Sequence, residues 1–79
     1  MAQHKWNVPP EILSRIKEAM SEKGMSGGTL ALEMDMDAVN LYSYLRGDSC
    51  MNVLRFRQIC EVLGVSADWI LFGKKIRLQ

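Results

Sequence analysis

The chain has 79 residues, with 10 lysines and arginines against 9 aspartates and glutamates, so its formal net charge is only +1. This length supports one small domain, near the lower limit at which a single core holds a fold without staples, and the apolar fraction of 48% with only two prolines favours a compact helical bundle. No apolar run approaches the ~20 residues of a membrane span, and the N-terminus lacks the apolar stretch of a secretory signal, so neither a membrane protein nor a secreted one is expected.

The first predicted helix begins at Pro9 and Pro10, because proline is acceptable in a first helical turn. It ends at Gly24. Its buried face is expected to hold the apolar residues at helical spacing: Ile12, Leu13, Ile16, Ala19 and Met20. In the N-terminal arm, residues 1–8, Trp6 and Val8 are expected to pack on the first helices. The alternative is an arm that reaches a partner through His4 and Lys5.

Two short helices joined by a tight turn are predicted over residues 26–47. Ser26 is expected to cap the first, over about residues 27–34, and Asp37 the second, over about residues 38–45, each by accepting a backbone N–H of the first turn. Gly47 is a stop signal, because glycine adopts the left-handed conformation of many helix ends. The shared buried face is expected to contain Leu30, Ala31, Met34, Met36, Leu41 and Leu45.

Two further helices are predicted toward the C-terminus. Asn52 is a good cap for a fourth helix, which is expected to bury Leu54 or Phe56 together with Ile59, Cys60 and Leu63, and Gly64 ends it. Ser66 is expected to cap a short fifth helix in which Trp69 packs in the core. Residues 74–79 alternate apolar and polar residues, which fits either an added strand or a frayed tail.

The two cysteines have no metal-like spacing, and His4 is the only histidine. We therefore expect no metal and no cofactor, with Cys60 as a core thiol and Cys50 as a loop thiol. Both are expected to be reduced, as in a cytoplasmic protein. No carboxylate pair or nucleophile arrangement points to an enzyme or to a small-molecule substrate.

The spacing of these signals resembles the Cro/phage-repressor (lambda-repressor-like) helix-turn-helix family. Gly24-Met25-Ser26 separates two helices, Leu30-Ala31 follows, and Arg46-Gly47 closes the unit; V-S-A-D-W-I-L-F-G then runs over residues 65–73. The resemblance covers about residues 12–73. It implies an all-α, five-helix bundle that forms a single DNA-binding domain over residues 1–79, with a C-terminal tail over residues 74–79. The outer face of the second helix of the motif would enter the major groove.

The resemblance places base-reading side chains at Ala38, Val39 and Ser43. Because Leu41 and Leu45 face inward, these residues lie outward or on the flank of the helix, with Asn40 beside them as a fourth candidate. Alanine and valine cannot hydrogen-bond a base edge, but they can pack against a thymine methyl. Contacts to phosphates are expected from the resemblance at Asn40, Tyr42, Arg46 and Asn52, and from open helix N–H groups at Ser26, Gly27 and Gly28. Lys23, Arg55, Arg57 and Lys5 are further candidates for supplying positive charge.

Three departures from the family pattern stand out. Asp35 occupies the usual turn-glycine position, and aspartate tolerates the left-handed conformation better than most residues. Met20 and Leu45 stand where many relatives have a partly buried ion pair, and the joint change to apolar residues is compatible with a stable core. Acids lie in or near the motif at Glu33, Asp35, Asp37 and Asp48, so one copy is expected to bind DNA weakly.

Four apolar residues near the C-terminus exceed what so small a core can bury, and they predict a homodimer interface: Ile70, Phe72, Ile76 and Leu78. The sequence therefore predicts a sequence-specific regulator, a phage- or prophage-type repressor that binds a palindromic operator in double-stranded DNA as a dimer. The alternative is a protein-interaction module on the same fold, such as an anti-repressor, an adapter or an antitoxin-type regulator.

Overall fold

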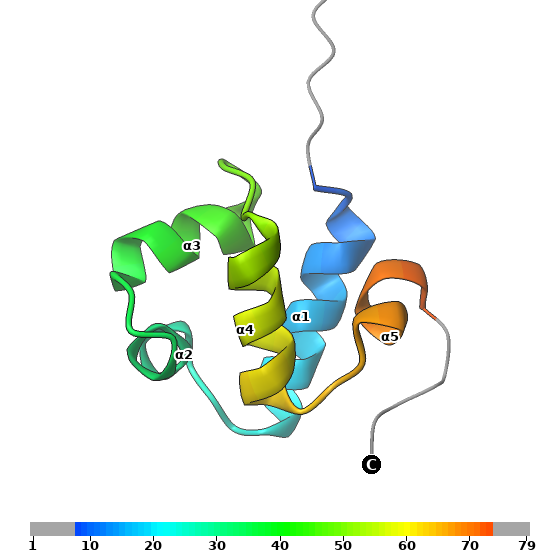
Figure 1. Ribbon diagram of the computed structural model, residues 1–79, viewed down its shortest axis with the longest axis horizontal. Coiled ribbons are helices and arrows are strands. Elements are labelled where there is room, and N and C mark those ends of the chain that lie inside the picture. The colour runs from blue at the N-terminus through cyan, green and yellow to red at the C-terminus, as the bar shows by residue number, and fades with distance from the viewer. Residues whose placement is uncertain (1–7, 74–79) are drawn as a thin grey trace, which may run out of the picture.

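A computed structural model describes residues 8–73, which form five helices and no strand (Figure 1). The helices are α1 (Pro10–Glu22), α2 (Gly27–Glu33), α3 (Ala38–Arg46), α4 (Val53–Leu63) and α5 (Ala67–Phe72). Helix α2 packs on α3 and α4, and α1 packs on α3 and α5. The predicted all-α class and the predicted order of five helices are confirmed, with α3 one residue longer and α2 one residue shorter than expected.

Three predicted caps start their helices as expected. The side-chain oxygens of Ser26, Asn52 and Ser66 accept hydrogen bonds from the backbone N–H groups three residues later, at 3.1, 2.8 and 3.0 Å. Asp37 differs: its backbone lies at the N-cap position, but its carboxylate makes no cap hydrogen bond, so that prediction is wrong. The exposed carboxylate contributes only as a negative charge near the positive end of α3.

The turn between α2 and α3 depends on a residue in the left-handed conformation. Asp35 has a φ of 55°, the only positive φ of a non-glycine residue within residues 8–73. The N–H of Met36 donates to the carbonyl of Ala31 at 3.0 Å, and that of Asp35 donates to Leu32 at 3.1 Å, which closes the end of α2. The expectation for Asp35 is confirmed. Because this conformation is strained for any residue with a Cβ, the turn forms at some cost.

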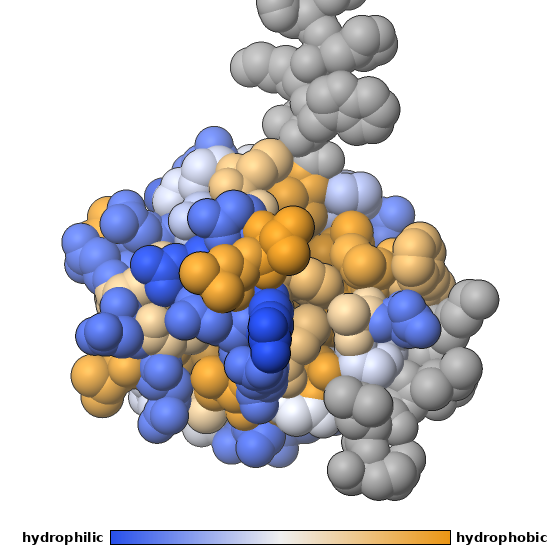
Figure 2. Space-filling view, in the orientation of Figure 1, coloured by the Kyte–Doolittle hydropathy of each residue, from blue (hydrophilic) through white to orange (hydrophobic). Residues whose placement is uncertain are grey.

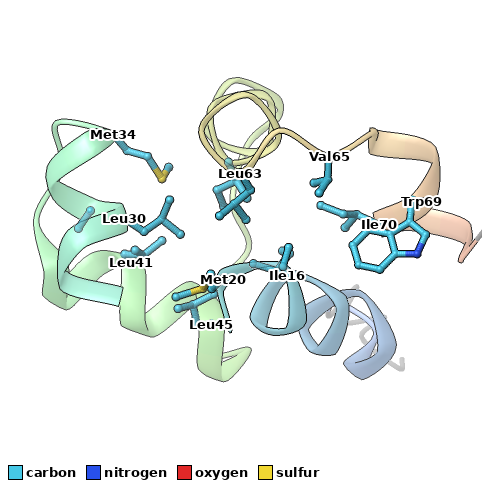
Figure 3. Packing of buried hydrophobic residues seen from close by; sticks show 13 residues of the cluster. Ile16, Met20, Leu30, Met34, Leu41, Leu45, Leu63, Val65, Trp69 and Ile70 are labelled. Carbon is cyan, nitrogen blue, oxygen red and sulfur yellow. The ribbon is translucent and has the colours of Figure 1, made fainter. Parts of the chain in front are cut away.

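One apolar core joins all five helices (Figure 3). Its completely buried large side chains are Ile16, Leu30, Met34, Leu41, Ile59 and Ile70. Met20 and Leu45 are both buried in this core, so the ion pair that many relatives have is replaced here by apolar packing. Trp69 is also buried, as predicted. Ile12, Met36 and Cys60 are only partly buried, at the edge of the core.

Two arginines tie helices together through backbone carbonyls. Arg15 of α1 donates to the carbonyl of Ile70 in α5 at 2.9 Å. Arg55 of α4 donates to the carbonyl of Met34, at the end of α2, at 3.3 Å, and to Gln58 at 3.0 Å. A cation near the last carbonyls of a helix is favourable. Arg55 therefore acts mainly in the fold and is a poor candidate for supplying charge to DNA.

Candidate nucleic-acid interface

The outer face of α3 carries the predicted base-reading residues. Val39 and Asn40 are exposed, with 71% of the Val39 surface accessible, whereas Ala38 is half-buried against the core. Ser43 is also half-buried, and its hydroxyl lies 2.9 Å from that of Ser49 in the following loop. The four candidates thus share one helix, but only Val39 and Asn40 are exposed.

Tyr42 lies between α3 and the first turn of α2. It follows Val39 by three residues and precedes Arg46 by four, so these three side chains form one stripe on α3. Of the residues expected to offer open N–H groups to phosphate, Ser26 and Gly28 are exposed, whereas Gly27 is buried. A Cβ built on Gly27 would lie 2.6 Å from the Tyr42 ring, so the ring covers this glycine. Gly27 was expected to offer an open N–H group to phosphate, and its contact with Tyr42 was not predicted.

The other predicted phosphate ligands are partly engaged. The Arg46 guanidinium forms an ion pair with Asp48 at 2.9 Å, and both side chains are about 60% exposed. Asn52 uses its Oδ1 to cap α4, so its amide nitrogen is the group that can donate to a phosphate. Arg57 forms an exposed ion pair with Glu61 at 3.2 Å. Lys23 is exposed at the end of α1.

Negative charge dominates the described part of the chain. Residues 8–73 contain six lysines and arginines and nine aspartates and glutamates, a formal net charge of −3. Four acids near α3 are exposed: Glu33, Asp35, Asp37 and Asp48. The remaining cations, Lys5, Lys74, Lys75 and Arg77, fall outside the described residues. With a formal net charge of only +1 over the whole chain, counterion release by one copy is a weak source of DNA affinity.

The predicted dimer residues separate into different environments. Ile70 is completely buried and points toward the interior beside Trp69 (Figure 3), so it cannot belong to a surface of the folded monomer and that prediction is wrong. A helix of six residues still presents two faces, and Ile70 lies on the inner one. Phe72 is 65% exposed. Ile76 and Leu78 lie outside the described residues.

A second exposed surface was not predicted. Val53 and Leu54, at the start of α4, are 84% and 62% exposed, and Leu71 is 38% exposed. Hydrophobic side chains gather over α4 and toward α5 (Figure 2). Two adjoining grooves with almost entirely apolar walls share Val53 and Phe56, and the first of them also contains Leu71. The signal for Leu54 was present in the sequence. It lies nine residues before the buried Leu63, about two and a half helical turns, which is the opposite side of α4.

We refer to Val53, Leu54, Leu71 and Phe72 as the apolar face. Cys50 lies in the wall of the first groove and Cys60 in that of the second. Cys50 is exposed, Cys60 is half-buried, and they do not form a disulfide. Burial, with a smaller effect of the Glu61 charge, raises the pKa of the Cys60 thiol above its usual value.

None of the helices within residues 8–73 is both long and apolar enough to span a bilayer. In the same part of the chain, no cluster of three or more histidine, cysteine or acidic residues is arranged to hold a metal ion.

Comparison with known families agrees with the geometry. A helix-turn-helix family model of the Cro/phage-repressor type matches residues 16–70, from the middle of α1 into α5. No curated protein matches the chain. The matched region is most of the chain and includes the α2–turn–α3 unit with its exposed outer face. The chain therefore belongs to the Cro/phage-repressor (lambda-repressor-like) helix-turn-helix family and is a DNA-binding transcriptional regulator of that type.

Proposed function

We propose that the protein is a sequence-specific repressor of the phage or prophage type that binds a palindromic operator as a dimer. The observation that carries this proposal is the exposed pair Val39 and Asn40 in the first turn of α3. The Val39 methyl groups suit contact with a thymine methyl, and the Asn40 amide suits a bidentate contact with adenine in the major groove. Ala38 and Ser43 flank this pair and contribute less surface.

Contacts to the DNA phosphate backbone would come from three helices. Ser26 and Gly28 start α2, Tyr42 and Arg46 lie on α3, and Asn52 starts α4. Such contacts fix the register of the recognition helix but carry no sequence information. Since the whole chain has a formal net charge of only +1, one domain supplies little electrostatic affinity. Two linked domains raise the effective affinity without any new kind of contact.

The apolar face is the proposed dimer interface. Its four residues are exposed and apolar, and clusters of this kind mark interaction sites. An isologous dimer would pair the same face of both copies and place two α3 helices one turn of DNA apart, about 34 Å. Ile76 and Leu78 remain candidates to extend this interface. Ile70 is replaced in the proposal by Val53, Leu54 and Leu71.

Selection of binding sites from random duplex DNA tests the proposal. We expect enrichment of a two-fold symmetric sequence, and light scattering should give a dimer at the concentration that saturates it. Asn40→Ala should reduce affinity for the selected site by about 1–3 kcal/mol while leaving nonspecific binding unchanged. Enrichment of no sequence, or an asymmetric site bound by a monomer, contradicts the proposal.

A protein-interaction module is the second candidate. The Arg46–Asp48 ion pair and the exposed acids around α3 favour it, because they reduce attraction to phosphate and leave Val39 and Tyr42 for an apolar contact. Titration with duplex DNA at several salt concentrations separates the two candidates. Binding that weakens as salt rises supports the repressor, whereas no binding even at low salt supports the interaction module.

A further inference from the structure

The first turn of α2 contains two glycines in different surroundings. Gly27 is buried and Gly28 is exposed. Neither has the positive φ that would require glycine. Alanine is the better helix former at such positions. The backbone conformation therefore does not explain why residue 27 is a glycine.

The explanation lies fifteen residues further along the chain, on α3. A Cβ built on Gly27 would lie 2.6 Å from the Tyr42 ring carbons Cε1 and Cζ and 2.7 Å from its hydroxyl oxygen, closer than the 3.0 Å that Cβ contacts respect in proteins. At Gly28 the nearest atom is Ser26 Oγ, at an ordinary 3.9 Å. The Tyr42 ring thus occupies the space that a side chain at residue 27 would need.

This contact lies beside the residues proposed to meet DNA. Tyr42 is 42% exposed, so one part of the ring is covered while another part faces solvent between Val39 and Arg46. Helices α2 and α3 pack against each other directly. A shift of α3 relative to α2 therefore displaces the exposed stripe that carries Val39, whereas rotation of the ring alone changes the surface between Val39 and Arg46.

We propose that Gly27 and Tyr42 form a size-matched pair that fixes the position of α3 on DNA. Tyr42 is then a positioning residue for DNA recognition, and glycine is required at residue 27 because of the ring. The inference rests on the proposed function, since it assigns these residues a role in reading the operator. A methyl group at residue 27 forces either the ring out toward the DNA, where it obstructs the approach of Val39 and Asn40 to the bases, or α3 away from α2, which shifts their register.

The test is whether the effect of Gly27→Ala on operator affinity depends on the side chain at residue 42. Four proteins are compared on the selected operator: wild type, Gly27→Ala, Tyr42→Ser and the double variant. In the presence of Tyr42, Gly27→Ala should weaken operator binding about tenfold, the scale of losing one base contact. In the Tyr42→Ser background the same change should leave affinity equal or raise it, because no ring is displaced and alanine favours the helix.

Two further variants separate positioning from other roles. Gly28→Ala makes the same chemical change one residue along the same helix turn, with open space around it, and any cost at the proposed phosphate contact should be equal in the two residue-42 backgrounds. Tyr42→Phe keeps the ring and removes the hydroxyl, so it should lose only the phosphate contact, keep the same preferred sequence and bind the operator more tightly than Tyr42→Ser. If the hydroxyl acted only as a phosphate donor, Tyr42→Phe would lose as much as Tyr42→Ser.

Circular dichroism confirms that each variant is folded before its affinity is compared. The pair is refuted if Gly27→Ala costs the same affinity in both backgrounds, if it costs none, or if the effect of Gly28→Ala depends on residue 42 as strongly. These outcomes are distinct from failure of the proposed function, in which the wild-type protein itself enriches no DNA sequence. In that case the role in recognition falls with it.

Discussion

Two exposed valines occupy the first turns of two helices, and their surroundings differ. Val39 in α3 is 71% exposed and has Asn40, Tyr42 and Arg46 close by in the sequence of its helix. Val53 in α4 is 84% exposed and has Leu54 beside it and an apolar groove on its flank. The first surface mixes methyl groups with hydrogen-bonding groups, whereas the second is almost entirely apolar.

This difference bears on what each surface can recognise. A base edge in the major groove presents donors, acceptors and thymine methyls, so a mixed surface can read it. An apolar surface makes no favourable contact with phosphates, but its burial against another apolar surface lowers the free energy. The α3 face therefore suits DNA, and the apolar face suits an apolar partner surface, which we propose is a second copy of the chain.

The largest expected effect comes from placing a charge on the buried side of α5. Ile70→Glu places a charge in a site with no exposed surface and should cost about 4 kcal/mol or more, enough to unfold most of so small a domain. Phe72→Glu, two residues along, should leave the fold intact because Phe72 is 65% exposed. Thermal unfolding followed by circular dichroism measures both. A folded Ile70→Glu protein would show that α5 can rotate and expose residue 70 to solvent.

A change on the apolar face should come next in size. Val53→Glu should give a folded monomer, because an acid in the first turn of α4 is compatible with the helix dipole. Loss of the second domain should weaken operator binding by about 10²-fold or more, at the lower end of what linked sites contribute. Light scattering and DNA titration measure the two effects.

Val39→Glu is the matched control, since it makes the same change at an exposed valine in the first turn of another helix. It should also reduce operator binding, by the roughly 1–3 kcal/mol of a lost base contact, but it should leave the dimer intact. If Val39→Glu dissociates the dimer, or Val53→Glu leaves a dimer with full affinity, the assignment of the two surfaces is reversed or wrong.

Features that depend on local sequence signals were predicted better than features that depend on contacts between distant parts of the chain. Ser26, Asn52 and Ser66 cap their helices as expected, because a cap needs only a backbone N–H three residues away. The orientation of Ile70 was not predictable in this way. Residues 69–72 are four consecutive apolar residues, and such a run has no periodicity to separate the inner face from the outer face.

The candidate site shows the same division. The exposure of Val39 and Asn40 followed from the inward positions of Leu41 and Leu45 on α3, which helical spacing alone establishes. The contact between Gly27 and Tyr42 joins two helices, and no local rule predicts which side chain will lie over a glycine. Asp37 is intermediate: the sequence placed it correctly at the helix start, but its carboxylate remains in solvent.

A smaller effect is expected from breaking the ion pair between Arg46 and Asp48 at the end of α3. Asp48→Asn removes the acid that pairs with Arg46 but keeps the shape of the side chain. The freed guanidinium should bind a phosphate more readily, so affinity for all duplexes should rise a few-fold. The slope of log affinity against log salt should steepen by about 0.9, as for one added phosphate contact. An unchanged slope would mean that Arg46 does not meet the backbone.

The smallest effects concern the two thiols in the walls of the grooves. At neutral pH the exposed Cys50 should be alkylated faster than the half-buried Cys60, because the thiolate is the reactive form and burial and Glu61 raise the pKa of Cys60. The rate at Cys60 should therefore keep rising as the pH increases beyond the usual thiol range. Glu61→Gln removes the smaller of the two causes and should speed Cys60 alkylation modestly at fixed pH. Mass spectrometry of each peptide follows both sites.

The same reaction reports on the apolar face. If this face is covered in a dimer, raising the protein concentration should slow alkylation at both cysteines in the wild-type protein. The Val53→Glu variant should show no such protection, because its two grooves stay open at every concentration. Equal rates at high and low concentration in a wild-type protein that light scattering shows to be dimeric would place the dimer contact elsewhere. If dimerisation protects neither thiol and Phe72→Glu abolishes the dimer, the interface would be restricted to α5.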